Sequence, residues 1–179
     1  MICISIADVT AAEAAEIVNA NELCEVRIDR LKLGSDDIKS LFSAKGKTIA
    51  TYRPSEGVSE STRIGTLLLA IRSGAAYVDI EVETGDLFKD EIIKAARKYG
   101  CKVITSYHDF VKTPVMRELE QVLNWCLESS PDIAKISCRV NSIEDNARLL
   151  SIYSLNKNVI SIGRSEEHTS ELQSPVVIS

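Results

Sequence analysis

Short β-type runs alternate with helical segments along almost the whole chain, and this alternation restricts the fold most. Apolar residues at every second position predict strands at 2–6, 23–29, 47–53, 76–82, 102–108, 133–138 and 158–163. Spacings near 3.6 predict helices at 11–20, 35–42, 61–73 and 86–99, one starting at Thr113-Pro114, and one from Asn141 or Ser142 to about 153. Strands joined through helices by short connections indicate an α/β fold with a parallel sheet.

Several predicted strands have one apolar and one polar face. In 23–29, Glu25, Arg27 and Asp29 alternate with apolar residues, and Asp79 and Glu81 do the same in 76–82. An open doubly wound sheet buries both faces, so its strands are apolar throughout. The inside of a closed barrel accommodates polar groups near the carboxyl ends of its strands. We therefore expect a (β/α) barrel rather than a Rossmann-like sheet, and the sequence has no G-x-G-x-x-G or Walker loop.

Composition narrows the class of protein. The length of 179 residues suggests one domain, and the net charge of −5 argues against nucleic acid as the main partner. No apolar run reaches the length that spans a membrane, and Met1 is followed by Ile2-Cys3-Ile4 without a basic segment, so neither membrane insertion nor a signal peptide is expected. Five scattered cysteines without a C-x-x-C pair suggest reduced thiols in a cytoplasmic protein.

Two residues stand out as candidate catalytic groups. His108 ends the run 102–108, and Lys135 lies in the middle of the run 133–138. Lysine is almost never buried without compensation, and a desolvated lysine is a good nucleophile. Histidine is the side chain best suited to move protons near neutral pH. We expect an amine nucleophile and an imidazole proton shuttle that face one cavity. A solvent-exposed lysine on an edge strand and a hydrogen-bonded core histidine are the alternatives.

Five motifs carry a resemblance to a known family. They are Glu25-Val26-Arg27-Ile28-Asp29, Thr51-Tyr52-Arg53 followed by Glu56-Gly57, Val78-Asp79-Ile80-Glu81, Ser106-Tyr107-His108-Asp109-Phe110 with Lys112-Thr113-Pro114, and Asp132-Ile133-Ala134-Lys135-Ile136. Across residues 1–163 the chain resembles type I 3-dehydroquinate dehydratase, and its short N-terminal part is similar to the archaeal branch. The resemblance implies a (β/α)8 TIM barrel, here truncated after about seven strands.

The resemblance also implies a reaction and a set of roles. The family dehydrates 3-dehydroquinate to 3-dehydroshikimate in the shikimate pathway of aromatic amino acid biosynthesis, without a metal or cofactor, and the intact enzyme is expected to be a homodimer. Lys135 would form an imine with the ketone, and His108 would transfer the protons. The substrate-binding residues would be Arg53, Arg27, Glu25 and Ser5, and Glu56 would assist the histidine, although its spacing from Arg53 is shorter than the family pattern.

Other interpretations of these polar residues stay open. The charges near Glu25 could form an internal ion-pair network. The acidic residues Glu25, Asp29, Asp79 and Glu81 could hold a divalent metal, although no second histidine accompanies them. The chain could also be an inactive barrel fragment, or another imine-forming lyase on the same scaffold.

The C-terminal end departs from the family. The arginine, serine and glutamine contacts of the last two strands have no counterpart, and the string from Arg164 to Ser174 resembles a translated sequencing adapter. We expect residues 1–163 to form an incomplete catalytic barrel and residues 164–179 to be a non-native tail, in which His168 has no functional role.

Overall fold

The computed structural model describes residues 2–165, which divide into two compact units. Unit 1 comprises residues 2–80 and 84–103, and unit 2 comprises residues 81–83 and the chain from 104 onward. Strand and helix alternate throughout the described residues, and neighbouring strands in each unit are neighbours in the sequence. The expected α/β fold with parallel strands is therefore confirmed, and the residues from 166 to 179, including His168, lie outside the described part.

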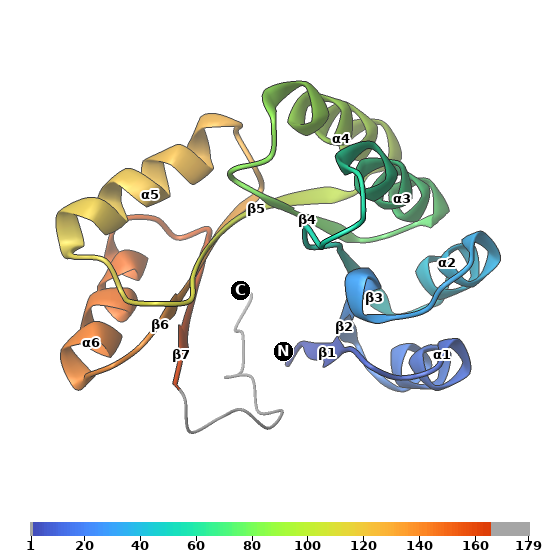
Figure 1. Ribbon diagram of the computed structural model, residues 1–179, viewed down its shortest axis with the longest axis horizontal. Helices are drawn as coiled ribbons and strands as arrows, with labels where there is room; N and C mark the ends of the chain where they lie inside the picture. Colours follow the sequence, from blue (N-terminus) through green and yellow to red (C-terminus); the bar gives the residue numbers. More distant parts are fainter. Residues whose placement is uncertain (1, 166–179) are drawn as a thin grey trace. The chain divides into compact units, whose positions relative to one another are not determined.

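Unit 1 is a parallel sheet with its helices on one side. Its strands are β1 (Ile4–Ile6), β2 (Leu23–Arg27), β3 (Lys47–Thr51) and β4 (Tyr77–Glu81), whose last residue belongs to unit 2, and they pair in chain order. Its helices are α1 (Ala11–Ala20), the 3₁₀ turn η1 (Ile28–Arg30), α2 (Ser35–Phe42), α3 (Glu60–Ser73) and α4 (Asp86–Tyr99). Figure 1 shows α1 to α4 along the same face of these strands.

The core of unit 1 lies between that face and the helices. Cys24, Val26, Ala50, Val78 and Ile80 from the strands pack in one buried cluster with apolar residues of the helices. Because side chains alternate across a strand, the residues between them project to the opposite face of the sheet. Those residues include the polar members of the predicted site.

Local signals set several helix ends as the sequence predicts. The Thr10 hydroxyl accepts a hydrogen bond from the Glu13 N–H, and the Glu13 carboxylate accepts one from the Thr10 N–H, which is a complete capping box. Gly74 ends α3 with φ of 112°, a left-handed conformation that glycine adopts without strain.

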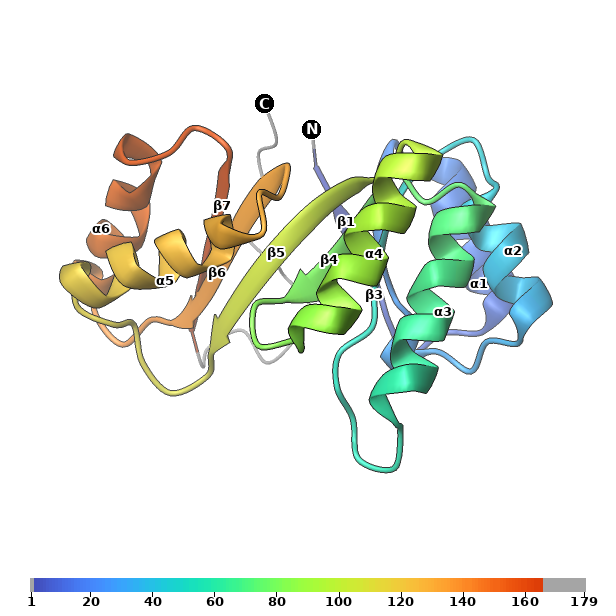
Figure 2. The ribbon, with the colours of Figure 1, turned by 90° about the horizontal axis from the view of Figure 1, so that it is seen from above.

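Unit 2 repeats the same pattern with three strands. They are β5 (Lys102–Asp109), whose first two residues belong to unit 1, β6 (Ile133–Arg139) and β7 (Val159–Arg164), all parallel. Helices α5 (Met116–Glu128) and α6 (Ile143–Ser151) and the 3₁₀ turn η2 (Ile152–Ser154) complete the unit. Figure 2 shows α5 and α6 on the same side of β6 and β7.

Two predicted boundaries are wrong for identifiable reasons. The strand expected at 23–29 ends at Arg27, because Ile28–Arg30 turn into a 3₁₀ helix. The helix expected from Thr113 begins at Met116 instead. The Thr113 hydroxyl donates to the Arg139 carbonyl oxygen at 2.7 Å, so it ties the loop to β6 rather than capping the helix.

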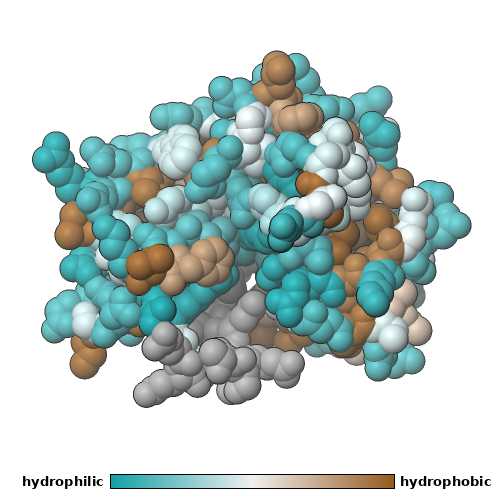
Figure 3. Space-filling view, viewed as in Figure 1, coloured by the Kyte–Doolittle hydropathy of each residue, from teal (hydrophilic) through white to brown (hydrophobic). Residues whose placement is uncertain are grey.

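The surface is mostly polar. On the face in Figure 3, hydrophilic residues (teal) predominate, and hydrophobic residues (brown) lie singly or in small groups between them. The most exposed apolar side chains, those of Leu87, Val111 and Ile143, come from separate elements. Scattered exposure of this kind is normal for a folded domain and marks no particular surface.

Packing around Gly163 gives a stability prediction. A Cβ atom at this position would lie 2.7 Å from Val140 Cγ2 and 2.8 Å from Asn146 Oδ1, so Gly163→Ala forces these two side chains to shift. We expect a loss of about 1–3 kcal/mol in the free energy of unfolding, measured by urea denaturation.

Gly65→Ala is the matched control. This glycine lies in α3 with nothing within 4 Å of the added Cβ, so the substitution should stabilise the chain by about 0.5–1 kcal/mol. Equal effects of the two substitutions would contradict the packing described for Gly163.

Candidate functional site

Lys135 and His108 lie on adjacent strands of unit 2. On β6, Ala134, Ile136 and Cys138 pack in the buried cluster with α5 and α6, so Lys135 projects from the opposite face. On β5, Tyr107 packs against that cluster, so His108 also projects from the opposite face. The two candidate groups therefore share the face of the sheet that the helices of unit 2 leave open.

The strand register brings the two groups close together. Ser106 is the partner of Lys135, and His108 is the partner of Ser137, which lies two residues beyond the lysine. Paired residues on adjacent strands are about 4.8 Å apart, and two residues along a strand add about 6.6 Å, so the two Cα atoms are about 8 Å apart. A lysine side chain spans most of that distance.

Lys135 is buried and lies on a central strand of the sheet. It is 8% exposed, and β6 lies between β5 and β7 in the sheet. The alternative of a solvent-exposed lysine on an edge strand is therefore wrong. Burial of an amine is the condition under which lysine becomes a nucleophile, because loss of hydration disfavours the charged form.

The end of β5 holds the imidazole in a defined setting. His108 is half-buried, and its ring stacks on Phe110 with centroids 6.0 Å apart and 14° between the planes. The Arg164 guanidinium lies 5.0 Å from the centroid of the Phe110 ring. The carboxylate of Asp109 accepts from the N–H groups of Val111 and Lys112 at 2.8 and 3.0 Å, which fixes the turn after the strand.

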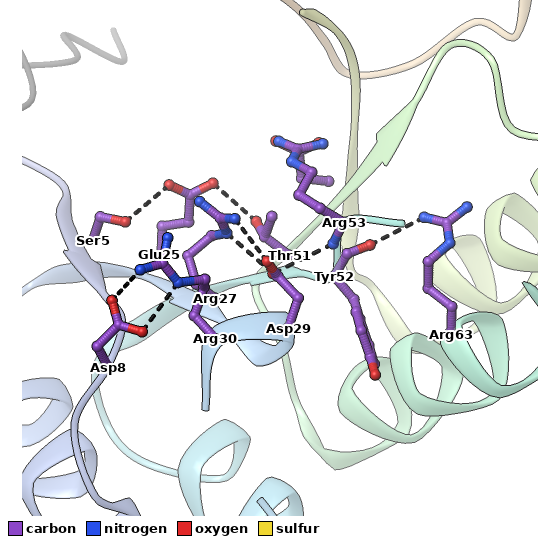
Figure 4. Close-up of polar contacts among 11 residues, drawn as sticks. Ser5, Asp8, Glu25, Arg27, Asp29, Arg30, Thr51, Tyr52, Arg53 and Arg63 are labelled. Carbon is purple, nitrogen blue, oxygen red and sulfur yellow. Dashed lines mark hydrogen bonds and ion pairs between the residues drawn. The ribbon is translucent and has the colours of Figure 1, made fainter. Parts of the chain in front are cut away.

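Glu25 is the centre of a second polar group, in unit 1. Its carboxylate accepts hydrogen bonds from Thr51 Oγ1 at 2.9 Å and Ser5 Oγ at 3.4 Å, and Figure 4 shows the three side chains side by side. They come from the adjacent strands β1, β2 and β3. The glutamate is 7% exposed, so these two hydroxyls supply hydrogen bonds to carboxylate oxygens that are removed from water.

The two predicted arginines each bind an aspartate. Arg27 donates to Asp29 through Nε and Nη2 at 3.1 and 2.7 Å. Arg53 donates to Asp79 through Nη1 and Nη2 at 3.0 Å each, and its backbone N–H donates to Asp29 at 3.3 Å. Asp79 is 1% exposed, so this pair is well shielded from water. Glu25 accepts from the hydroxyls of Ser5 and Thr51, whereas Arg27 is oriented by Asp29.

Three of the four acidic residues that could act as metal ligands have other partners. Asp29 and Asp79 are bound by arginines, and Glu25 is bound by hydroxyls. Within residues 2–165, no group of three or more His, Cys, Asp or Glu side chains is arranged to hold a metal ion.

Glu56 lies exposed in the loop between β3 and α3. The base of this loop is held by Arg63, a residue that the sequence analysis did not single out. Its guanidinium is 2% exposed and donates to the Tyr52 carbonyl at 3.1 Å (Figure 4) and to Thr84 Oγ1 at 3.0 Å. The ion pair with Arg63 lowers the pKa of Glu60. In the sequence, Arg63 lies on the same face of its helix as the apolar residues that pack inward, and this pattern could have revealed its role.

Cys138 gives a prediction about pH. Burial under α5 and α6, with a smaller contribution from the nearby Asp109 carboxylate, raises the pKa of this thiol to about 12 from its ordinary value of 9.0. Between pH 9 and about 12 the folded chain keeps this proton and the unfolded chain loses it. The free energy of unfolding should therefore fall as the pH rises through this window, and Cys138→Ala should reduce that slope in urea titrations.

Thiol labelling provides the control for this prediction. The half-buried Cys3 should react with a thiol reagent at pH 8 in the folded chain, whereas Cys138 should react only after unfolding. Equal labelling rates for the two cysteines in the folded state would contradict the assigned burial.

None of the helices between residues 2 and 165 combines the length and apolar character that a membrane crossing requires.

Comparison with known proteins agrees with this arrangement. A family profile described as type I 3-dehydroquinase matches residues 2–166. The 3-dehydroquinate dehydratase of Methanosarcina acetivorans is 31% identical in an alignment that covers 89% of this chain and 73% of that protein. The protein of the same name from Methanococcus vannielii is 35% identical, with 93% and 80% covered.

A solved structure gives the same result for the fold. The 3-dehydroquinate dehydratase of Enterococcus faecalis superposes with a TM-score of 0.77 at 24% identity, covering 91% of this chain and 78% of that one. The expected (β/α)8 barrel family, represented by seven strands among the described residues, is thereby confirmed. From the profile match and the identity to curated relatives, we conclude that this chain belongs to the type I 3-dehydroquinase family.

Proposed function

We propose that this chain dehydrates 3-dehydroquinate to 3-dehydroshikimate through an imine on Lys135. The observation that carries the proposal is a buried lysine one strand away from His108, on the same face of the sheet, in a chain of this family. The names of the relatives at 31% and 35% identity support the same reaction.

The chemistry follows from the two side chains. The neutral amine of Lys135 adds to the ketone and, after loss of water, forms an imine. The protonated imine withdraws electrons, so the neighbouring carbon gives up its proton more easily. His108 takes that proton and then donates one to the departing hydroxyl group. The imine itself supplies the electron sink, so the proposal needs no metal or organic cofactor.

The polar group of unit 1 would bind the substrate. Arg53 and Arg27 present guanidinium groups, which suit a carboxylate, while Glu25 and Ser5 can exchange hydrogen bonds with hydroxyls. We propose that Glu56 orients or polarises His108. This role is based only on the resemblance of the Arg53–Glu56 motif to the family. The Arg53–Asp79 and Arg27–Asp29 pairs would hold the arginines in position for an anion.

The wider biological setting is part of the same proposal. We place the reaction in the shikimate pathway of aromatic amino acid biosynthesis, in the cytoplasm, and expect the intact enzyme to be a homodimer. Size-exclusion chromatography with light scattering tests the last point.

Two alternatives stand beside this proposal. Alignments with five archaeal relatives cover 73% to 81% of the length of those relatives. The chain could therefore be a barrel fragment without turnover. It could also be another imine-forming lyase, since Lys135 and His108 suit that chemistry in general.

Borohydride trapping distinguishes the dehydratase from these two alternatives. The full chain is incubated with 3-dehydroquinate and sodium borohydride, which reduces an imine to a stable secondary amine, and peptides are mapped by mass spectrometry. We expect an adduct on the peptide that contains Lys135, together with release of 3-dehydroshikimate. An adduct without product indicates another lyase or an incomplete enzyme. A folded chain without any adduct rejects the proposed function.

A further inference from the structure

Ser137 carries a polar group that the mechanism above does not use. It is 1% exposed, and its hydroxyl has no hydrogen-bond partner among the described residues. A buried hydroxyl without a partner costs free energy, because it gives up its hydrogen bonds to water without replacement. Packing alone would favour alanine at this position.

The strand geometry places this hydroxyl beside both proposed catalytic groups. Ser137 follows Lys135 by two residues on β6, so the two side chains share a face. In the register it is the partner of His108 on β5 and of Ile162 on β7. The Ser137 side chain therefore has Lys135 beside it on its own strand, the His108 imidazole on β5 and the apolar Ile162 side chain on β7.

The chemistry of imine formation creates a group that this hydroxyl could bind. When the lysine amine adds to a ketone, a C–N bond forms and the carbonyl electrons move to oxygen, which takes a proton from nitrogen. The resulting carbinolamine has a new hydroxyl on the carbon bonded to Nζ. This hydroxyl then takes up a proton from the solvent and leaves as water, while the nitrogen lone pair forms the C=N bond of a protonated imine. A donor near Nζ would stabilise the oxygen through both steps.

We propose that the Ser137 hydroxyl donates a hydrogen bond to the carbinolamine oxygen on Lys135, and is thus a further catalytic residue. The serine keeps its own proton, so the balance of the reaction is unchanged. This inference rests on the proposed function, since it requires an imine on Lys135. It accounts for a buried hydroxyl that the folded chain by itself does not use.

The test compares rates of borohydride trapping at saturating 3-dehydroquinate. Ser137→Ala is expected to slow the appearance of the Lys135 adduct about tenfold, the effect of losing one hydrogen bond. The substrate concentration at half-saturation should change by less than about twofold, since the bond forms after binding. Ser137→Cys, which has a weaker donor, should fall between the two.

Thr48→Val is the matched control. The Thr48 hydroxyl is also buried without a described partner, but it lies in unit 1, on the strand face that carries Ala50 toward the helices. Both substitutions remove an unpartnered buried hydroxyl, so both should leave Tm unchanged or raise it by about 2–4 °C. Only Ser137→Ala should slow trapping.

The outcomes are separable. If the unsubstituted chain forms no adduct, the proposed function fails and the role of Ser137 fails with it. If the unsubstituted chain forms the adduct and Ser137→Ala traps at the same rate, only the role of Ser137 is overturned. Its hydroxyl then has no part in imine formation. A Ser137→Ala chain that does not fold, or that loses several degrees in Tm, also overturns the inference, because the hydroxyl would then be structural.

Discussion

Replacement of Lys135 by methionine is expected to abolish the borohydride-trapped adduct and to reduce turnover of 3-dehydroquinate to background. Nζ is the only atom of this side chain that can form an imine. Methionine has a similar length but no nucleophilic nitrogen. Lys135→Arg should give the same loss. It retains the positive charge, but a guanidinium does not lose its proton in a protein and cannot attack a ketone.

Lys157→Met serves as the control for these two variants. Lys157 is an exposed lysine of unit 2, so its substitution should change neither the adduct nor its rate. Circular dichroism checks that all variants fold. An adduct that persists at full stoichiometry in Lys135→Met, or that maps to another lysine in the unsubstituted chain, would show that the nucleophile is assigned to the wrong residue.

Replacement of His108 by alanine is expected to lower turnover by about 10²–10⁴-fold, the usual contribution of a general acid–base group. The adduct on Lys135 should still form, because the imine precedes removal of the proton from carbon. Its mass gives a sharper result. In the variant the trapped adduct should retain the substrate hydroxyl, whereas the unsubstituted chain should also yield an adduct lighter by one water.

His168→Ala is the matched control, since His168 is the only other histidine of the chain and lies outside the described residues. It should leave both turnover and adduct masses unchanged. If His108→Ala still yields the dehydrated adduct at the unsubstituted rate, another group removes the proton. Loss of all adduct from a folded His108→Ala chain would instead assign His108 to imine formation.

Local patterns accounted for most of the secondary structure. Helices α1 and α4 have the predicted bounds, because caps such as Thr10 and terminal glycines such as Gly100 act over a few residues. The predicted start of α5 failed because a distant group intervened. Thr113 bonds to Arg139 on another strand rather than to its own helix, and no local pattern contains that partner.

The sequence by itself determined the alternation of strands and helices, the apolar face of each strand, and the choice of Lys135 and His108 as candidates. These properties depend on the period of the chain and on side-chain chemistry, which are local. The tertiary structure alone decided which residues meet across strands. Register pairs His108 with Ser137 and leaves a buried hydroxyl beside Lys135, and it brings Arg53 onto Asp79. Such contacts depend on how separate strands hydrogen-bond with one another, which the spacing within one strand does not encode.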